Sequence, residues 1–345
     1  MINELIQKAA ELKASDLHIA FGSCPKIRVD GDLIDMPGEA ILADADCEAI
    51  AAELLGREMP DNGEYDLALE SSGRRIRGNV YRQSGHVSCA IRLLSDNIPE
   101  LESLGLPRAV SQLPELHSGI VLVTGETGSG KSTTLASLLK RINQEQYRHI
   151  ITLEDPIEYI HNSEKCLVDQ REIGKDSESY AMALRAILRE DPDVILIGEM
   201  RDLETIETAL TAAETGHLVF ATLHTNSAAD SIDRIVDVFP SERQKQIRMQ
   251  LSTTLRAVLA QQLLKKQGGG RVAACEFMMV NPAIKNLIRE GKTPQIESAL
   301  QTSANIGSIS MDNAILNLYK DRLIDARTAL DYCRDKEYVG KTARY

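Results

Sequence analysis

The segment 125–133 carries the strongest chemical signal in this sequence. It matches the pattern GxxxxGK[ST] in full, through Gly125-Glu126-Thr127-Gly128-Ser129-Gly130-Lys131-Ser132, with Thr133 following. A short apolar run precedes it and a helical pattern begins with its last residues. Glycines let such a loop curl so that backbone N–H groups and a helix N-terminus face a phosphate. We therefore predict a nucleotide-binding loop in which Lys131 bridges the β- and γ-phosphates and the Ser132 hydroxyl ligates Mg²⁺.

Acidic residues follow two other apolar runs that we predict to be buried strands. Val194–Ile197 ends in Gly198-Glu199, and Ile150–Leu153 ends in a segment with three carboxylates, Glu154, Asp155 and Glu158. Because the carboxyl ends of parallel strands form the ligand-binding edge of an open α/β sheet, Glu199 is placed to hold Mg²⁺ or its water. One of the three carboxylates is placed to activate the attacking water, whereas strand-end solubility and helix capping also explain Glu154 and Asp155.

Two histidines bracket a fourth apolar run, Leu218–Thr222. His224 is expected at the same carboxyl edge, within hydrogen-bond reach of a γ-phosphate. His217 lies at the other end of the run and needs a different explanation, and a structural role is about as common as a functional one for a single histidine.

Arginines are relevant because hydrolysis builds negative charge on the γ-phosphoryl oxygens, and a neighbouring subunit can supply the compensating guanidinium. A solvated surface or a local ion pair accounts for any one arginine equally well. As a set they suggest a shared subunit interface, and the candidates are Arg77, Arg82, Arg92, Arg185, Arg189 and Arg201.

The elements that must position these residues change in character near residue 97. Before it, helical spacing at 3–14 and 44–55 alternates with strand patterns, and a hairpin is expected to turn at Asp30-Gly31. Strands are expected at 17–20, 65–70, 74–83 and 87–93, which makes residues 1–97 one α+β module. Three prolines, Pro99, Pro107 and Pro114, interrupt the next segment, so we predict a linker at 98–114.

Beyond the linker, short β-branched runs alternate with amphipathic stretches, which is typical of a parallel sheet buried on both faces. Helices are expected at 131–143, 178–189, 203–215 with Asp202 as N-cap, and 228–236. After Pro240 we expect helix through Gln244–Lys265 and then, past three consecutive glycines at 268–270, four further helices.

Composition excludes several classes of protein. The 345 residues, 43% of them hydrophobic, suit a globular protein of about two domains. A net charge of -12, with nine Tyr, four Phe and no Trp, disfavours nucleic acid as a partner. Six scattered cysteines without a CxxC pair indicate reduced thiols in a cytoplasmic protein. No apolar run approaches the ~18 residues of a membrane span, so a membrane role is expected only through a partner.

Four segments together resemble the Walker A, Asp box, Walker B and His box of the type II/type IV secretion ATPase superfamily. They are GETGSGKST (125–133), ITLEDPIEY (151–159), LREDPDVILIGEMRD (188–202) and TGHLVFATLHTNSA (215–228). Within the superfamily, SDLHI at 15–19, GEMRD at 198–202, AIKNLIREGK at 283–292 and the short N-terminal module resemble the type IV pilus retraction ATPases, the PilT family.

The resemblance implies a PAS-like N-terminal domain at 1–97 and a RecA-like ATPase domain at 115–345 whose residues 281–345 form a helical C-terminal region. It implies ATP and Mg²⁺ as ligands, Glu158 as the water-activating base, Glu199 near Mg²⁺, and His217 and His224 as conformational sensors. It further implies a homo-hexameric motor that couples ATP hydrolysis to pilus retraction and twitching motility. Such a motor would be cytoplasmic, at the inner-membrane face, with a platform protein and a paralogous retraction ATPase as partners.

Two positions depart from the family pattern. Glu126 stands where family members commonly have Pro, and Lys285 stands where the AIRNL motif has Arg. A carboxylate near phosphates is repulsive unless it points outward or meets an arginine. The alternatives are a pilus extension or type II secretion ATPase and a non-hydrolysing regulatory subunit of a paralogous ring. The absence of a longer N-terminal region and of a four-cysteine insert argues against the former, and the complete set Lys131, Ser132, Glu158 and Glu199 against the latter.

Overall fold

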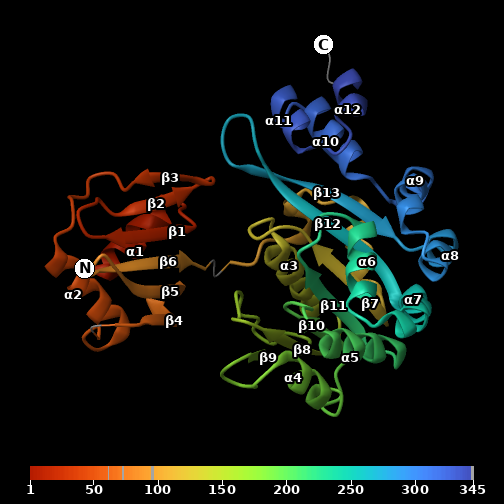
Figure 1. The fold of residues 1–345 in the computed structure, drawn as a ribbon, viewed down its shortest axis with the longest axis horizontal. Coiled ribbons are helices and arrows are strands. Elements are labelled where there is room, and N and C mark those ends of the chain that lie inside the picture. The colour runs from red at the N-terminus through yellow and green to blue at the C-terminus, as the bar shows by residue number, and fades with distance from the viewer. Residues whose placement is uncertain (61, 72–73, 95–96, 343–345) are drawn as a thin grey trace. The chain divides into compact units, whose positions relative to one another are not determined.

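The computed structural model describes residues 1–60, 62–71, 74–94 and 97–342. The chain divides into two compact units, Met1–Asn97 and Ile98–Tyr345 (Figure 1). In the described ranges, none of the helices combines the length and the apolar character that crossing a bilayer requires.

The first unit is an antiparallel sheet with two helices. The strand order is β3-β2-β1-β6-β5-β4. Its elements are α1 (Ile2–Glu11), β1 (Asp16–Ala20), β2 (Lys26–Val29), β3 (Asp32–Asp35), α2 (Asp44–Leu55), β4 (Glu64–Ser71), β5 (Arg74–Gln83) and β6 (His86–Leu93). Apolar side chains of both helices and of the sheet, such as Ile6, Leu17 and Ile50, form one core. The expected hairpin turns at Asp30 and Gly31, which have φ values of 50° and 95°.

The second unit is built on a sheet of seven strands in the order β13-β12-β7-β11-β10-β8-β9. All neighbours are parallel except β12 and β13. The strands are β7 (Gly119–Thr124), β8 (His149–Glu154), β9 (Leu167–Glu172), β10 (Val194–Ile197), β11 (Leu218–Leu223), β12 (Leu255–Lys265) and β13 (Arg271–Met279). Successive residues of β7 alternate between two core clusters, Ile120 and Leu122 in one and Val121 and Val123 in the other. The prediction of strands buried on both faces is therefore confirmed.

Helices cover both faces of this sheet (Figure 1). One face packs against α4 (Tyr180–Ile187), α5 (Leu203–Glu214), α6 (Ala228–Asp237), α7 (Ser241–Thr254), α8 (Pro282–Glu290) and α9 (Ile296–Thr302). The other face packs against α3 (Lys131–Glu145) and the 3₁₀ helices η1 (Leu101–Leu104) and η2 (Arg108–Glu115). The expected N-cap of α5 is present, because the Asp202 carboxylate accepts a hydrogen bond from Thr205 N at 2.8 Å.

The C-terminal helices form a small core of their own. After η3 (Thr293–Gln295) and η4 (Ala304–Ile306) come α10 (Met311–Lys320), α11 (Ala326–Tyr332) and α12 (Lys336–Thr342). Ile315 and Val339 pack there with Leu264 of β12 and Ala274 of β13. Residues 343–345 of the expected helical region lie outside the described residues.

The helix expected at Gln244–Lys265 is wrong in its second half. Helix α7 ends at Thr254, and Leu255–Lys265 is strand β12, paired with β7 on one side and β13 on the other. Leu, Ala and Gln are good helix formers, so local propensity favours helix here. Burial of residues such as Val258 and Leu259 in the two core clusters outweighs that propensity. The three glycines, all with positive φ, form the turn into β13. The expectation of helix directly after these glycines is also wrong, because Arg271–Met279 is a strand.

The linker expected at 98–114 is also corrected. This segment forms η1 and most of η2, and Leu101, Val110 and Leu113 are buried in the core on the α3 side of the sheet. Its prolines prevent a long α-helix but are compatible with short 3₁₀ turns, so the segment packs as part of the second unit.

Candidate functional site

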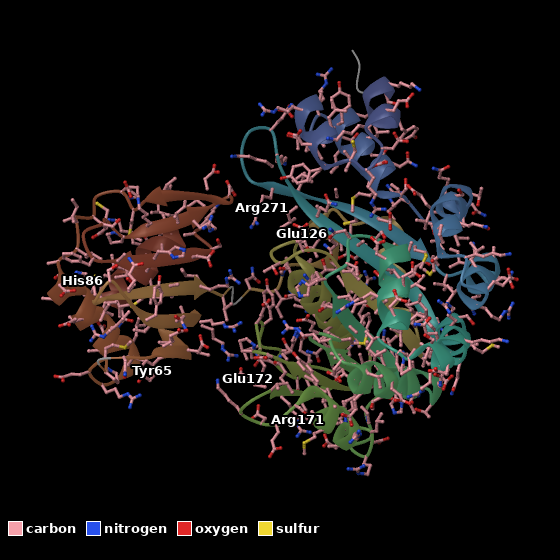
Figure 2. All side chains as sticks on the ribbon, viewed as in Figure 1. Tyr65, His86, Glu126, Arg171, Glu172 and Arg271 are labelled. Carbon is pink, nitrogen blue, oxygen red and sulfur yellow. The ribbon has the colours of Figure 1, made fainter. Side chains whose placement is uncertain are left out.

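The first residue of the loop between β7 and α3 has a backbone conformation that only glycine can adopt. Gly125 has a φ of +140°, and a Cβ placed on it would lie 2.3 Å from Gln261 O and 2.6 Å from Ser129 Oγ. Gly128 and Gly130 also have positive φ. Figure 2 labels Glu126, the exposed residue that follows Gly125 in this loop.

Lys131, the first residue of α3, is tied to this loop. Its ammonium donates hydrogen bonds to Gly125 O at 2.7 Å and to Glu126 O at 2.9 Å. Burial lowers the pKa of Lys131, whereas the carboxylates of Glu199, Glu158 and Glu126 act in the opposite direction. Carboxylates from three separate parts of the chain therefore lie close enough to this ammonium to influence its pKa.

Glu199 follows β10 and contacts two cationic or titratable side chains. Its Oε2 accepts a hydrogen bond from Arg201 at 2.6 Å, and its Oε1 lies 3.4 Å from His224 Nε2. Burial raises the pKa of Glu199, but the hydrogen bond from Arg201 and the charges of His224 and Arg201 outweigh burial, so the net pKa is lowered. The structure thus places His224 and an ionised Glu199 together at the carboxyl edge of the sheet.

The three carboxylates at and after the end of β8 have different surroundings. Glu154 accepts hydrogen bonds from Thr152 Oγ1 at 2.7 Å and from Glu158 N at 3.4 Å, and burial raises its pKa. Asp155 is exposed. The Glu158 carboxylate makes no hydrogen bond to any residue in the described part of the chain, and it lies near enough to Lys131 to affect its pKa. Of the three, Glu158 combines a carboxylate without a hydrogen bond in the described part of the chain with a half-buried position near Lys131.

A cavity of about 40 Å³ joins these elements. Ser132 of α3 lines it together with Glu154 at the end of β8, Tyr159 after β8, Gly198 after β10 and Thr222 of β11. The start of α3 and the carboxyl ends of three strands therefore meet at one place, as the position of the motifs predicts.

His217 does not join this cluster within one chain. It precedes β11, and its Nδ1 lies 2.9 Å from Ala212 O and 3.2 Å from Thr215 Oγ1 at the end of α5. The six residues of β11 separate it from His224 by ~20 Å. His217 thus closes the C-terminus of a helix at the opposite edge of the sheet.

Of the candidate arginines, Arg201 is the one that lies in the cluster. Arg185 of α4 forms an ion pair with Glu204 of α5, and Arg189 is exposed after α4. The others belong to the first unit: Arg77 is exposed on β5, Arg82 donates to the carbonyls of Pro60 and Gly85, and Arg92 on β6 pairs with Asp16 at 3.0 Å.

The residues of the loop fit a bound nucleotide and its metal ion. Ser129 Oγ and Thr124 Oγ1 are buried at the loop without a hydrogen-bond partner among the residues described. Buried polar atoms of this kind normally have partners in the functional state. The Ser132 hydroxyl and the ionised Glu199 are oxygen ligands of the type that Mg²⁺ prefers.

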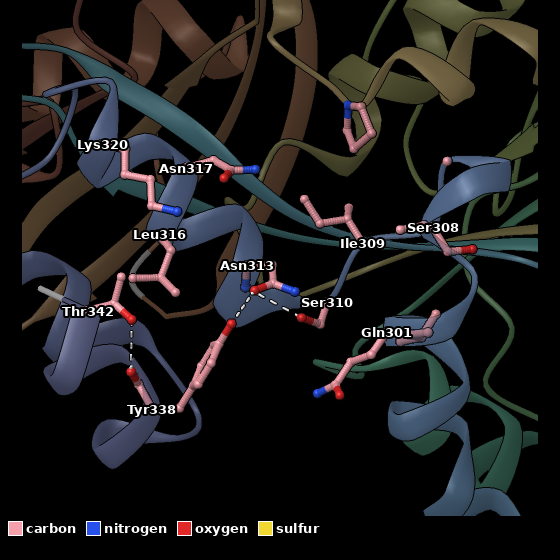
Figure 3. Close-up of a pocket in the computed structure, with 14 residues that line it drawn as sticks. Gln301, Ser308, Ile309, Ser310, Asn313, Leu316, Asn317, Lys320, Tyr338 and Thr342 are labelled. Atoms are coloured by element: carbon pink, nitrogen blue, oxygen red, sulfur yellow. Dashed lines mark hydrogen bonds between the residues drawn. The ribbon is translucent and has the colours of Figure 1, made fainter.

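The larger cavity of the second unit lies elsewhere. It measures about 500 Å³ and is lined by α9, α10 and α12 and the loop around Ile309 (Figure 3). Tyr338 donates a hydrogen bond there to Asn313 Oδ1 at 2.9 Å. None of the predicted site residues lines this cavity, so we place the candidate site at the β7–α3 loop.

Comparison with known proteins places the chain in a family. The family described as "Type II/IV secretion system protein" matches residues 1–316. The type IV pilus retraction ATPase PilT of Pseudomonas aeruginosa is 46% identical over 343 residues, which cover 97% of this chain and 99% of that protein. A twitching motility protein of Neisseria gonorrhoeae is 44% identical over 332 residues, or 95% of this chain and 88% of that protein. The chain belongs to the PilT family.

A crystal structure of the pilus retraction motor PilT with bound ADP has the same fold. It is 46% identical, covers 99% of both chains and gives a TM-score of 0.86. The chain therefore has the PilT-family architecture of an N-terminal domain followed by a RecA-like ATPase domain. The family and the fold class predicted from the motifs are both confirmed.

Glu126 is one of the two departures from the PilT-family pattern, and within the described residues its carboxylate contacts an amide and no arginine. It points outward, and its Oε1 lies 3.5 Å from Asn226 Nδ2, in the loop that follows His224. Sequence reasoning missed Asn226. It also missed Gln170 on β9, whose side chain contacts the segment that carries Glu158. For Asn226, the only signal was its position two residues after His224 in the His box.

Proposed function

We propose that this chain is a motor ATPase that drives type IV pilus retraction. The observation that carries the proposal is a complete phosphate-binding loop, with Lys131 bonded to its carbonyls, whose helix start meets the carboxyl ends of β8, β10 and β11 at one cavity. The relatives named as a pilus retraction ATPase and a twitching motility protein support the choice of pilus retraction as the work performed.

The phosphate-binding part of the site is the loop 125–133. Its backbone N–H groups and the N-terminus of α3 would face the phosphates of ATP, and Lys131 would supply a compensating positive charge. Ser132 and Glu199 would hold Mg²⁺, which supplies charge that neutralises the phosphate oxygens. His224, 3.4 Å from Glu199, is placed to respond to a change at the γ-phosphate.

Glu158 has the role of general base. A carboxylate oxygen of Glu158 accepts the proton of the attacking water while the water oxygen forms a bond to the γ-phosphorus and the bond from phosphorus to the leaving ADP oxygen breaks. The neighbouring Glu154 is less suited to this role, because its oxygens already accept hydrogen bonds from Thr152 Oγ1, Gln170 Nε2 and Glu158 N.

Mechanical work requires that nucleotide states differ in their affinity for different conformations of the protein. We infer a homo-hexamer in which Arg77, Arg92, Arg185 and Arg189 are candidates for contacts across subunits. Force would pass to a platform protein at the cytoplasmic face of the inner membrane. On the basis of the family resemblance, we also propose a paralogous retraction ATPase as a partner.

Steady-state hydrolysis by the purified full chain tests the chemistry. We expect Lys131→Ala to abolish turnover and Glu158→Gln to lower kcat by about 10² to 10⁴ while nucleotide still binds. Glu164→Gln is the matched control, because Glu164 is exposed a few residues further along the same loop. Normal kcat in Glu158→Gln would overturn the assignment of the base.

A pilus count tests the work performed. A strain without this gene and a strain with only the Lys131→Ala allele should both carry excess surface pili and lose surface motility. Loss of pili in both strains would instead identify an extension motor.

A further inference from the structure

Two side chains from the edge strand β9 hold the segment that carries Glu158. The Ile157 amide donates a hydrogen bond to Glu172 Oε2 at 3.3 Å, and Gln170 makes the remaining contacts. Gln170 Nε2 donates hydrogen bonds to Tyr159 O at 2.8 Å and to Glu154 Oε1 at 3.3 Å. Gln170 Oε1 accepts a hydrogen bond from His161 N at 2.8 Å. The Nε2 and the Oε1 of Gln170 therefore both form hydrogen bonds with the backbone that immediately follows Glu158.

Two further hydrogen bonds tie this segment to its surroundings. Tyr159 Oη lies 2.9 Å from Thr133 Oγ1, which connects the segment to the first turn of α3. The Glu158 amide donates to Glu154 Oε2 at 3.4 Å. The backbone around Glu158 is thus attached to β9, to α3 and to the end of β8, although its carboxylate makes no hydrogen bond in the described part of the chain.

We propose that Gln170 is a positioning residue for the water-activating carboxylate of Glu158. The inference rests on the proposed function, since it assumes that Glu158 takes the proton. Gln170 acts through the backbone of residues 159–161 and does not contact the substrate. A displacement of about 1 Å at a reacting group can lower a rate by about a hundredfold, so the attachment of this segment controls turnover.

The chemistry of position 170 requires an amide. A carboxylate there would accept the hydrogen bond from His161 N but would offer no donor to Tyr159 O or Glu154. It would also add a negative charge beside Glu154. Gln170→Glu is therefore expected to impair turnover although the side chains have nearly the same shape.

The first test compares kcat and KM of the full-length protein. We expect Gln170→Ala and Gln170→Glu to lower kcat about tenfold to a hundredfold while KM for ATP and the affinity for ADP stay within about threefold. The matched control is Gln146→Ala, because Gln146 is also half-buried and its Nε2 donates to Pro114 O at 2.9 Å, away from the site. Equal effects of Gln170→Ala and Gln146→Ala on kcat would overturn the proposal.

The second test is a double-mutant cycle in single-turnover hydrolysis. If Gln170 acts through Glu158, adding Gln170→Ala to Glu158→Gln should cause little further loss, because the base is already absent. A full additional loss would overturn the positioning role. An unchanged rate in Glu158→Gln alone would instead overturn the proposed function.

Tyr159→Phe keeps the test decisive if Gln170→Ala fails to fold. It removes only the hydroxyl that contacts Thr133 and keeps the packing of the ring. We expect a several-fold lower kcat at unchanged KM. An unchanged kcat in both Tyr159→Phe and the folded Gln170→Glu protein would contradict the proposal.

Discussion

Arg334 and Glu276 form an ion pair of 2.7 Å in which the glutamate side chain is only 2% exposed. Glu276 belongs to β13, and Arg334 lies between α11 and α12. The same guanidinium donates to Asn226 O, and Glu276 Oε1 accepts a hydrogen bond from Ala228 N at 2.8 Å. The C-terminal helices are thereby fastened to the loop that follows His224, next to the phosphate-binding loop.

Arg334→Ala should lower the free energy of unfolding by about 3–5 kcal/mol, because it leaves a buried carboxylate without its cation. Urea unfolding of the full chain measures the change. Arg327→Ala is the control on the same C-terminal helices, since Arg327 is 90% exposed and 3.8 Å from Asp331. Its effect should stay below about 0.5 kcal/mol, and a similar loss in both variants would contradict the importance of the buried pair.

The stability cost of losing Arg334 should depend on pH. Burial raises the pKa of Glu276 while Arg334 opposes that shift, so removing Arg334 raises the pKa further. A carboxyl whose pKa is higher in the folded state binds protons more tightly there, so stability falls as pH rises from its ordinary pKa to the raised one. The difference in unfolding free energy between the wild type and Arg334→Ala should therefore shrink towards acid pH. A difference that is constant with pH would show that Glu276 is not the group left unpaired.

Gly125→Ala should abolish nucleotide binding, because its Cβ would overlap Gln261 O at 2.3 Å and force the loop to move. Binding of a fluorescent ATP analogue measures the loss. Gly269→Ala is the matched control: its φ of +102° carries a similar backbone penalty, but nothing lies within 4 Å of the added Cβ. That variant should lose about 1 kcal/mol of stability or more and keep its affinity. Retained affinity in Gly125→Ala would refute the tight fit of the loop.

Substitution of His224 should affect turnover, whereas substitution of His217 should affect stability. His224→Ala should lower kcat, because it removes a neighbour of Glu199, whereas His217→Ala should lower the free energy of unfolding by about 1 kcal/mol through the lost helix-end hydrogen bond. Steady-state kinetics and urea unfolding on the same preparations distinguish the two. A large loss of kcat in His217→Ala with stability unchanged would instead support a sensor role across subunits.

The parts of the fold that could be predicted were those with a strong local signal. The run Ile120–Val123 is rich in β-branched residues, is buried on both faces and leads directly into the glycine loop. Strand, loop and helix signals therefore agree with one another. The Asp30-Gly31 turn likewise has a backbone requirement that its residues reveal. For the site, the motifs indicated Glu158 and Glu199, and the structure shows why Glu154 is less available.

The parts that could not be predicted depend on distant partners. Strand β12 has the composition of a helix and becomes a strand only because β7 and β13 lie on either side of it. Strand β9 is mostly polar at a sheet edge, so it lacks the apolar run that marked the other strands. Gln170 was missed for the same reason, since its partners at 154, 159 and 161 are identified only when β9 pairs with β8.

The strand order also determines when the site can form as the chain is synthesised. Strand β7, which carries the phosphate-binding loop, has β11 and β12 as its neighbours, and both come later in the sequence. In the register of the sheet, Val123 pairs with Thr222. Contacts between such distant residues make folding slow, because a long stretch of chain must be ordered before they form. A nascent chain that has emerged only as far as α5 therefore contains the whole glycine loop but has no strand to hold it, and nucleotide binding must await the last third of the protein.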